Sequence, residues 1–288
     1  MRPIRAVAET HRTVPSSLKR NYLYYDTSIR PWASVIIPIK DERENLVPLI
    51  DQLLKVLESR QESCTAPFEI LFIDDGSTDG SSSLLDQMTE QYAPVTVFHL
   101  DKNYGKTAAL DAGFTQSRGE LVITLDGDLQ TDSADIGTLL PYVAQYDLVC
   151  GRRMVRQDHL IRKLSSRIAN FVRNAVIADG MHDTGYGFMI FHRAVIEKVP
   201  LFEGMHRFFP ALALMHGFTV IEVPVRHYPR VHGISKYGVG NRLFKGLYDL
   251  FAVRWMQSRC LRYRIRQDST PARAQFPPSK PNSSSTIQ

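Results

Sequence analysis

Cysteines and long hydrophobic runs are scarce in this sequence, and each absence excludes a class of protein. Three cysteines occur among 288 residues, widely spaced and without a CxxC pair, which excludes a disulfide-stapled scaffold and favours a reducing compartment. No run approaches the roughly 18 apolar residues of a membrane-spanning helix, so no such helix is expected. Arg2 and Arg5 are not followed by an apolar segment, so no signal peptide is expected either. The cysteines are Cys64, Cys150 and Cys260.

Several common ligand-binding motifs are also missing. Neither GxGxxG nor GxxxxGK[ST] follows the first predicted strand, where residues 38–42 read Pro-Ile-Lys-Asp-Glu. The nine histidines show no HxxxH or HxxE spacing, so no transition-metal site is expected. RNA-recognition aromatics and zinc-finger spacings are absent, so the sequence pI near 9.1 does not indicate a nucleic-acid partner.

The composition supports a folded chain with one strongly basic region. Hydrophobic residues make up 43% of the chain and charged residues 23%, which is enough apolar material for a core and excludes a disordered protein. Between Arg226 and Arg266 there are ten basic residues and one acid, Asp249, so this segment carries +9. The whole chain carries +5, which leaves −4 for the remainder. The basicity is therefore local and indicates an anionic partner at one end of the molecule.

Apolar strands alternate with amphipathic helices in the first half of the chain. Strands are predicted over residues 34–38, 69–73, 95–100 and 121–125, and helices over 46–57, 84–88 and 108–114. Strands that are apolar throughout are buried on both faces, so the pattern predicts an α/β fold whose mainly parallel sheet is flanked by helices. After Val149 the alternation loosens into a mixed region that runs to about Val225, and residues 242–256 form a further predicted helix.

Acidic residues follow three of the predicted strands: Asp41-Glu42, Asp74-Asp75, and Asp126 with Asp128. Ligands of open parallel sheets bind at the carboxyl ends of the strands. Turn formation alone would explain one acidic strand end, but three at one edge concentrate negative charge that a cation or ligand donors must neutralise. Carboxylates without histidine or cysteine suit Mg²⁺ or Mn²⁺, ions that commonly bridge phosphates. The sequence therefore predicts a nucleotide site that holds its diphosphate through a metal.

Six short motifs, in order along the chain, resemble those of the GT-A glycosyltransferases of family 2. They are Val35–Pro38 with Asp41-Glu42, Phe72–Asp79, Leu125–Gln130, Gly151–Arg153, Asp183–Phe188 and Arg230–Lys236. The last three are similar to motifs of the polyprenyl-phosphate sugar synthases, of which dolichyl-phosphate mannose synthase is the type. The resemblance covers about residues 34–260 and implies a Rossmann-like GT-A fold with a carboxyl-terminal amphipathic helical segment.

The resemblance also implies a division of the chain. Residues 1–33 are expected to be a leader, and 34–232 the catalytic domain, with its nucleotide half ending near 130 and its acceptor half after it. Residues 233–266 are expected to be a basic, membrane-proximal helical segment, and 267–288 a disordered tail rich in proline and serine.

The matching positions carry implied roles. Nucleotide-sugar binding is assigned to Pro38, Lys40, Glu42, Asp75, Asp126, Gly127, Asp128, Arg153 and Arg207. Metal binding is assigned to Asp126, Asp128 and Gln130, and phosphate or acceptor binding to Arg162, Ser166, Arg230 and Lys236. The catalytic candidates are Asp128, Asp183, Arg230 and Lys236.

The implied reaction is inverting transfer of a sugar from GDP-mannose or a UDP-hexose to a polyprenyl phosphate. A phosphate nucleophile is already anionic near neutral pH, so Asp183 either acts as a base or only orients its turn. Arg230 and Lys236 either bind phosphate or belong to a solvated loop. Two departures bear on the donor, because Lys40 replaces the usual aromatic residue and Met189 replaces an arginine.

Alternative functions are a non-processive transferase acting on a soluble or glycan hydroxyl, and a catalytically silent nucleotide-sugar-binding protein. Processive members carry QxxRW, whereas Phe251 stands here in the position of the glutamine. Residues 241–256 mix large apolar side chains with Lys and Arg, which indicates either a core-facing helix or an interfacial helix on anionic lipid. We expect a peripheral protein on the cytoplasmic face of the membrane, which binds the anionic surface either by itself or through an integral membrane partner, and no nucleic acid among its ligands.

Overall fold

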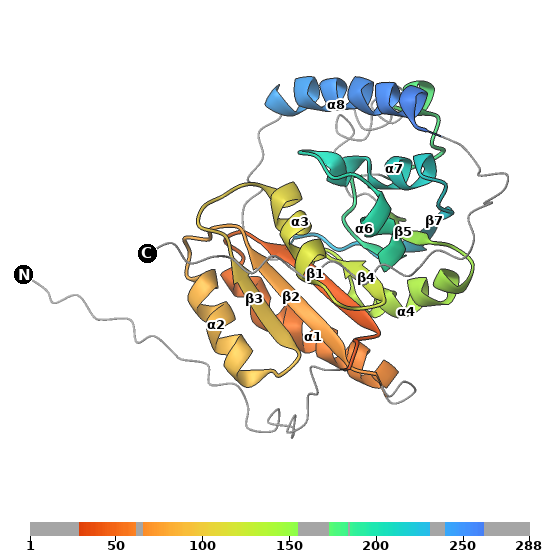
Figure 1. Ribbon diagram of the computed structural model, residues 1–288. Helices are drawn as coiled ribbons and strands as arrows, with labels where there is room; N and C mark the ends of the chain where they lie inside the picture. Colours follow the sequence, from red (N-terminus) through yellow and green to blue (C-terminus); the bar gives the residue numbers. More distant parts are fainter. Residues whose placement is uncertain (1–28, 62–65, 155–172, 184, 231–239, 262–288) are drawn as a thin grey trace, which may run out of the picture.

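A computed structural model describes residues 29–61, 66–154, 173–183, 185–230 and 240–261. These residues form a seven-stranded sheet. Figure 1 shows this sheet between two layers of helices. The strands are β1 (Ala33–Ile39), β2 (Phe68–Asp74), β3 (Val95–His99), β4 (Leu121–Thr124), β5 (Leu148–Arg153), β6 (Met189–His192) and β7 (Val220–Val225). Their order in the sheet is β3-β2-β1-β4-β6-β5-β7. The four strands predicted in the first half are all present, within two residues of their predicted bounds.

Six strands point the same way, and β6 alone is reversed. β1 pairs in parallel with β2 and β4, β2 with β3, and β5 with β7, whereas β6 is antiparallel to both β4 and β5. Because of the reversal, Met189 at the start of β6 pairs with Thr124 at the end of β4. The residues that precede β6 therefore lie at the same edge as the residues that follow the other strands.

The helices cover both faces of the sheet. They are α1 (Arg43–Gln61), α2 (Ser81–Gln91), α3 (Lys106–Gln116), α4 (Ile136–Leu139), α6 (Arg193–Lys198), α7 (Phe209–Met215) and α8 (Gly240–Arg259). Short 3-10 turns are η2 (Ser133–Asp135), η3 (Leu140–Ala144) and η4 (Met205–Arg207). The predicted helix over 242–256 falls within α8. The predicted tail over 267–288 and nearly all of the predicted leader lie outside the described residues.

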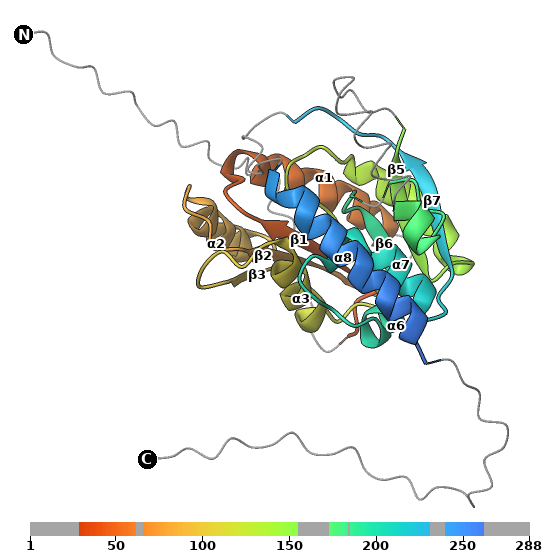
Figure 2. The ribbon, with the colours of Figure 1, turned by 90° about the horizontal axis from the view of Figure 1, so that it is seen from above.

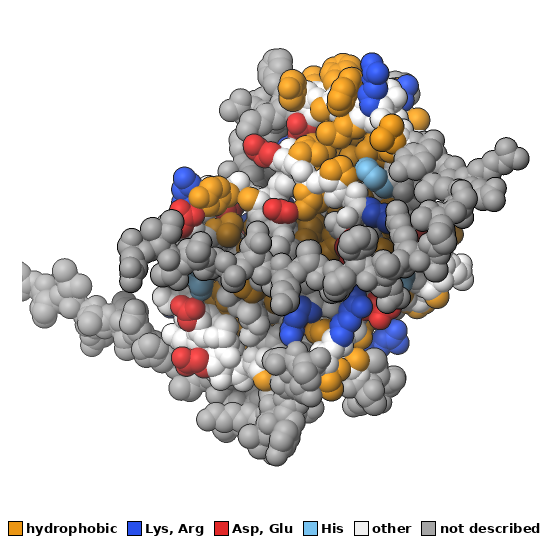
Figure 3. All heavy atoms as spheres, in the orientation of Figure 1, with side chains coloured by type: hydrophobic (Ala, Val, Ile, Leu, Met, Phe, Trp, Pro, Cys, Tyr) orange, Lys and Arg blue, Asp and Glu red, His pale blue; other side chains and the backbone are white. Residues whose placement is uncertain are grey.

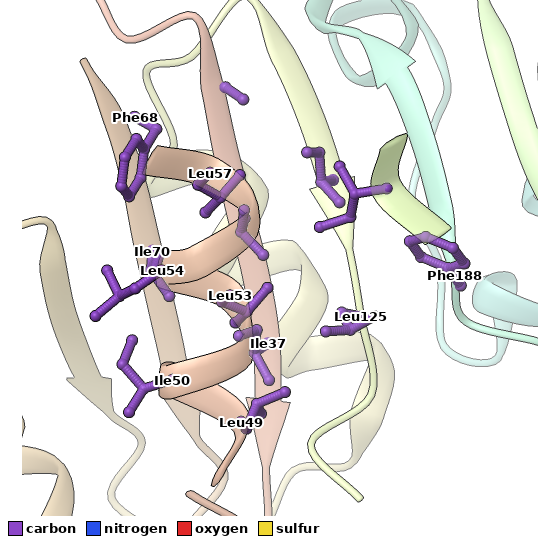
Figure 4. Packing of buried hydrophobic residues seen from close by; sticks show 14 of the residues in the cluster. Ile37, Leu49, Ile50, Leu53, Leu54, Leu57, Phe68, Ile70, Leu125 and Phe188 are labelled. Atoms are coloured by element: carbon purple, nitrogen blue, oxygen red, sulfur yellow. The ribbon is translucent and has the colours of Figure 1, made fainter. Parts of the chain in front are cut away.

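Side chains of each central strand alternate between two hydrophobic clusters. In β1, Val35 and Ile37 face one cluster together with α1, whereas Ile36 faces the other together with α3. Figure 4 shows Leu53 and its neighbours on α1 packed over β1 and β2. Both faces of the strands are thus buried, which explains why the strands are apolar throughout.

Helix α8 is the outermost element over the second cluster, as Figures 1 and 2 show. Leu250 and Val253 are its buried anchors, at 4% and 0% exposure. Cys260, just after the helix, donates weakly to the Met215 carbonyl of α7, at 3.5 Å. No helix within the described residues is both long and apolar enough to span a bilayer.

Candidate active site

The three acidic strand ends predicted from the sequence meet at one edge of the sheet. Ile39 at the end of β1 pairs with Asp74 at the end of β2, and β4 lies on the other side of β1. Asp126 and Asp128 follow β4 directly. We call this edge, with the segments that follow β1, β2 and β4, the acid edge.

Asp75 is buried and holds two neighbouring segments together. Its carboxylate accepts hydrogen bonds from the backbone N–H groups of Tyr104, at 2.6 Å, and Gly105, at 2.9 Å. Its own N–H donates to the Ile39 carbonyl, at 2.8 Å. Lys40 donates to the Gly76 carbonyl, so the turns after β1 and β2 are tied to each other as well.

Beside these turns an open pocket of about 590 Å³ is lined by charged side chains, among them Lys40, Asp74, His99 and Lys102. Asp74 lies at its base and accepts hydrogen bonds from Ser77, Ser82 and His99. Burial raises the pKa of the Asp74 carboxyl, but these hydrogen bonds outweigh burial and leave the pKa below its ordinary value. The buried acid is therefore held in its ionised form.

Asp126 is paired with a lysine that the sequence analysis did not single out. Lys106, the first residue of α3, donates to the Asp126 carboxylate. Burial raises the pKa of Asp126, but Lys106 opposes burial most strongly, and the pKa lies below its ordinary value. His206 and Arg153 lower that pKa further, which places both within electrostatic reach of Asp126.

Asp128 is paired with Arg230, which follows β7. The Arg230 guanidinium donates to Asp128 Oδ2 at 2.7 Å and to Glu42 Oε1 at 3.3 Å, so it bridges the ends of β4 and β1. Burial and the nearby Asp126 raise the pKa of Asp128 above its ordinary value, although Arg230 lowers it. The ionised forms of Asp126 and Asp128 therefore repel each other, although each carboxylate is paired with a cation.

Gln130 connects the acid edge to the segment after β7. Its side-chain amide donates to the Tyr228 carbonyl at 3.3 Å, and the Tyr228 N–H donates to the Gln130 carbonyl at 2.9 Å. The next residue along, Thr131, forms an isolated bridge with His227. Residues 226–230 are thereby held against residues 128–132.

Arg153 ends β5 and forms a two-pronged ion pair with Asp183. Its Nε and Nη2 atoms each donate to one carboxylate oxygen of Asp183, both at 2.7 Å, and its backbone N–H donates at 3.2 Å. The guanidinium carbon lies 5.2 Å from the centroid of the Tyr186 ring. Asp183 reaches this position because it precedes the reversed strand β6.

The remaining predicted residues lie elsewhere. Arg207, on η4, is paired with Asp249 of α8 at 3.6 Å, so the structure brings its guanidinium to the helix layer. Arg162, Ser166 and Lys236 lie outside the described residues. The roles implied for all these residues remain predictions.

Three charged residues near the acid edge were missed by the sequence analysis. Lys106 follows Gly105 just beyond β3, Arg226 follows β7, and Glu222 lies within β7. Arg226 donates through its N–H and its guanidinium to Asp135. Position at the end of a predicted strand is the signal that found the acids. It did not apply to Lys106, which begins α3, or to Arg226, because β7 was not delimited from the sequence. Nothing in the sequence pattern distinguishes Glu222.

Comparison with protein families and curated relatives gives a consistent picture. Residues 34–200 match the family model "Glycosyl transferase family 2". The chain is 32% identical over 239 residues to a dodecaprenyl-phosphate galacturonate synthase of Rhizobium johnstonii, covering 81% of this chain and 68% of that protein. It is 37% identical over 219 residues to an undecaprenyl-phosphate 4-deoxy-4-formamido-L-arabinose transferase of Pseudomonas aeruginosa, covering 75% and 63%. The chain therefore spans about two thirds of the length of these relatives.

Solved structures share the fold at low sequence identity. A glucosyl-3-phosphoglycerate synthase from Mycobacterium tuberculosis, crystallised with Mn²⁺ and UDP, superposes with a TM-score of 0.59 at 16% identity, over 80% of each chain. A mannosyltransferase from Pyrobaculum calidifontis, crystallised with GDP-Man and Mn²⁺, gives 0.56 at 20% identity, over 79% of this chain and 65% of that one. The expected GT-A fold is confirmed, and the chain belongs to glycosyl transferase family 2.

Proposed function

We propose that this protein transfers a sugar, with inversion, from a nucleoside diphosphate sugar to a polyprenyl phosphate. The observation that carries the proposal is the turn with Asp126 and Asp128, which sits at the acid edge between the cations Lys106 and Arg230. Such a site suits a diphosphate with its counter-ion. Membership of family 2 and the names of the two bacterial relatives support a polyprenyl phosphate as the acceptor.

A divalent metal fits the donor set of this turn. Asp126 and Asp128 offer carboxylate oxygens and Gln130 an amide oxygen, which are ligands that hard divalent ions prefer. Burial first, and Asp126 second, raise the pKa of Asp128, and a bound cation would stabilise its ionised form. No cluster of three or more His, Cys, Asp or Glu suited to a metal occurs within the described residues, so diphosphate and water would complete the coordination. Mg²⁺ or Mn²⁺ bound there would neutralise the charge of the leaving diphosphate.

The nucleoside would lie against the turns after β1 and β2. Asp75 is the proposed contact for the base or ribose, with Pro38, Lys40 and Glu42 in the same pocket. Lys40 supplies a cation and no aromatic ring at this position, so we expect polar rather than stacking contacts with the base. The phosphates would be met by Arg153, Arg162, Ser166, Arg230 and Lys236.

The reaction is a single displacement at the anomeric carbon. A phosphate oxygen of the acceptor forms the new C–O bond while the bond to the diphosphate breaks, which inverts the configuration. The phosphate is anionic near neutral pH, so no strong base is required. Both oxygens of Asp183 accept hydrogen bonds from Arg153, which favours an orienting role for Asp183.

Helix α8 offers a surface for binding the membrane that carries such an acceptor. Tyr248, Phe251 and Trp255 are spaced by three and four residues, so they share one face, and they are 78%, 63% and 64% exposed. Figure 3 shows hydrophobic and basic side chains together at the top of the view, where α8 runs. Leu250 and Val253 already supply the contacts with the core. The aromatic face is thus left for an anionic lipid surface, on the cytoplasmic side where nucleotide sugars are found.

The transfer proposal is tested by a donor screen. Radiolabelled GDP- and UDP-sugars are incubated with a short polyprenyl phosphate and Mg²⁺ or Mn²⁺, and organic-phase label is measured. We expect label in the lipid with one donor, and its loss with EDTA. Transfer only to a soluble or glycan hydroxyl would support the alternative acceptor, and nucleotide binding without transfer to any acceptor would support a silent binding protein.

The membrane proposal is tested by co-sedimentation with vesicles across a salt series. Each basic residue near an anionic leaflet contributes about 1 kcal/mol, screened over about 10 Å at 0.1 M salt, so binding should weaken as salt rises. Phe251→Ser and Trp255→Ser should reduce binding, whereas Tyr142→Ser, a change at an exposed aromatic on η3, should not. Equal binding to neutral vesicles would exclude the electrostatic part. If the protein binds neither neutral nor anionic vesicles, an integral membrane partner would have to bring it to the lipid acceptor.

A further inference from the structure

Glu222 is a buried carboxylate on β7 that holds a backbone segment from another part of the chain. It lies opposite Cys150 of β5, and its side chain is 8% exposed. Its oxygens accept hydrogen bonds from the N–H of His182, at 2.9 and 3.0 Å, and from the N–H of Asp183, at 2.8 Å. The His182 ring contacts the same carboxylate at 2.8 Å. Four contacts therefore fix residues 182 and 183 to β7.

A second set of contacts joins Asp183 to Arg153. Asp183, 6% exposed, accepts from the backbone N–H, Nε and Nη2 of Arg153. Two parallel charge-assisted bonds set the plane of the guanidinium as well as its position. Because Glu222 fixes the backbone from which the Asp183 side chain extends, Glu222 also determines where the Arg153 guanidinium lies.

The placement of Arg153 connects this chain of contacts to the acid edge. The Arg153 guanidinium carbon lies 5.2 Å from the centroid of the Tyr186 ring, and the Tyr186 hydroxyl bonds Thr131 at 2.7 Å. The next residue, Gly187, lies against Asp126, since a Cβ atom there would be 2.8 Å from Asp126 Oδ1. Arg153 is therefore held beside the turn on which we place the metal. An arginine so placed presents a fixed cation to a phosphate.

Burial of the charged Glu222 carboxylate is unfavourable in free energy. Burial raises the pKa of Asp179, and Glu222 raises it further, so the two acids repel each other. Burial likewise raises the pKa of the Cys150 thiol, again with a contribution from Glu222. A buried charge of this kind is tolerated when strong hydrogen bonds compensate for the loss of water. The hydrogen bonds from residues 182 and 183 provide that compensation for Glu222.

We infer that Glu222 is a positioning residue for phosphate binding: through Asp183 it sets the Arg153 guanidinium against a phosphate group of the substrates. The inference rests on the proposed function in one respect, since it takes Arg153 to be a phosphate ligand. The phosphate belongs either to the nucleoside diphosphate donor or to the lipid acceptor, and two experimental arms distinguish them.

The test uses the full chain with Glu222→Ala and Glu222→Gln. In the donor arm, calorimetry measures the Kd of GDP and of UDP with Mn²⁺, without turnover; in the acceptor arm, steady-state kinetics give the KM for a short polyprenyl phosphate. We expect Glu222→Ala to raise one of these constants by about 10-fold or more, with a smaller effect on kcat, since charge-assisted contacts are worth that much. Glu222→Gln keeps an acceptor oxygen and should restore part of the affinity.

A matched control is Asp147, which comes immediately before β5 and lies beside the start of β7. The Asp147 carboxylate accepts from the N–H of Thr219 at 2.8 Å and from its hydroxyl at 2.7 Å, just before β7 begins. Asp147→Ala removes the same kind of anchor away from the acid edge. We expect it to lower Tm and to leave both affinities unchanged.

A double-mutant cycle separates positioning from general stability. If Glu222 acts through Arg153, Glu222→Ala should cost little further affinity in an Arg153→Ala background. Additive losses, or Glu222 variants that change only Tm as Asp147→Ala does, would overturn the inference. Failure of lipid transfer by the unmodified protein would refute the proposed function, yet the donor arm would still decide the role of Glu222.

Discussion

The two halves of the sheet contribute opposite charges to the site. The β1–β4 half supplies Glu42, Asp126 and Asp128 at its carboxyl edge, whereas the β5–β7 half supplies Arg153 and Arg230. Arg230 crosses between the halves and pairs with acids of the first. Asp126 and Arg153 are paired within their own halves, with Lys106 and Asp183, so Arg230 provides ion pairs that join the two halves.

Substrate binding must separate an ion pair that joins the two halves. Asp128 is the proposed ligand of the metal and Arg230 that of a phosphate, yet here they are bonded to each other. A donor that arrives with its metal supplies a positive partner for the aspartate and a negative one for the arginine. The pair between the halves can therefore open without leaving either charge uncompensated.

Replacement of Asp128, an acid of the β1–β4 half, should have the largest effect on activity. Asp128→Ala should lower turnover by about a hundredfold or more, because charge developing on the leaving diphosphate loses its stabilisation. The fold should persist, since the change also relieves repulsion with Asp126. Asp132→Asn is the control, as that carboxylate is paired with Arg226 instead. Near-normal turnover of a folded Asp128→Ala protein would remove the metal assignment.

A second prediction concerns the closest approach of the two halves. A Cβ atom on Gly187 would lie 2.7 Å from Lys106 Nζ and 2.8 Å from Asp126 Oδ1. Both are ends of flexible side chains, so Gly187→Ala should fold while displacing the Lys106–Asp126 pair. We expect weaker Mn²⁺-dependent nucleotide binding with little change in Tm. Gly185→Ala, where the added atom meets nothing within 4 Å, is the control. Unchanged nucleotide affinity would show that the halves do not meet at a functional position.

Two arginines that follow β7, Arg226 and Arg230, should differ in their contribution to phosphate binding. Arg230→Ala should weaken a phosphate contact by about 1.5–3 kcal/mol, seen as a higher KM and a lower kcat. Arg226→Ala, which removes a pairing with Asp132 and Asp135, should leave both constants near their original values. Lys236→Ala is expected to resemble Arg230→Ala. Equal kinetics for all three variants and the unmodified protein would show that neither Arg230 nor Lys236 binds phosphate.

The smallest expected effect is a pH dependence of stability confined to the first half. His99 bonds Asp74 and Asp86, and although burial lowers the pKa of His99, these acids raise it above its ordinary value of 6.5. Its stabilising contribution is therefore complete below pH 6.5 and is lost as pH rises through the folded-state pKa. The pKa of Asp74 is lowered from 3.8, so its contribution holds above that pH and is lost as pH falls through the folded-state value.

His99→Asn should thus lower Tm more at pH 6 than at pH 9. The difference should correspond to less than about 1 kcal/mol, because a partly exposed ion pair is screened by water. Thermal unfolding at the two pH values measures it. Equal losses at both would show that His99 contributes only packing.

The sequence predicted the first half of the molecule much better than the second. Continuous apolar runs such as 70–73 indicate a parallel sheet covered on both faces, and this pattern alone places Asp74 and Asp126 at one edge. The reversed strand β6 has only four residues, Met189–His192, and carries no signal of its direction. Asp183 could therefore be placed only through the family resemblance.

The missed residues share a physical reason. Lys106 and Arg226 resemble ordinary surface charges in a sequence, because their partners Asp126 and Asp135 are distant along the chain. In the sequence, Glu222 resembles the exposed polar position of a strand with one face in solvent. Its burial depends on the contacts with residues 182 and 183, which the sequence does not indicate. Ion pairs between distant segments depend on tertiary contacts that local patterns do not encode.

The reversal of β6 also has a consequence for the order in which the molecule folds. The strands β1 to β4 are joined by sequential βαβ connections, and β4 pairs with β1. The other edge of β4 is paired only when Met189 returns beside Thr124, after β5 has been passed. Contacts between distant residues close large loops and form slowly. We therefore expect the nucleotide-facing strands to gain hydrogen-exchange protection first during refolding. The segment with Arg153 and Asp183 would follow, so an interrupted folding reaction would leave a chain with its acids in place and no arginine to meet them.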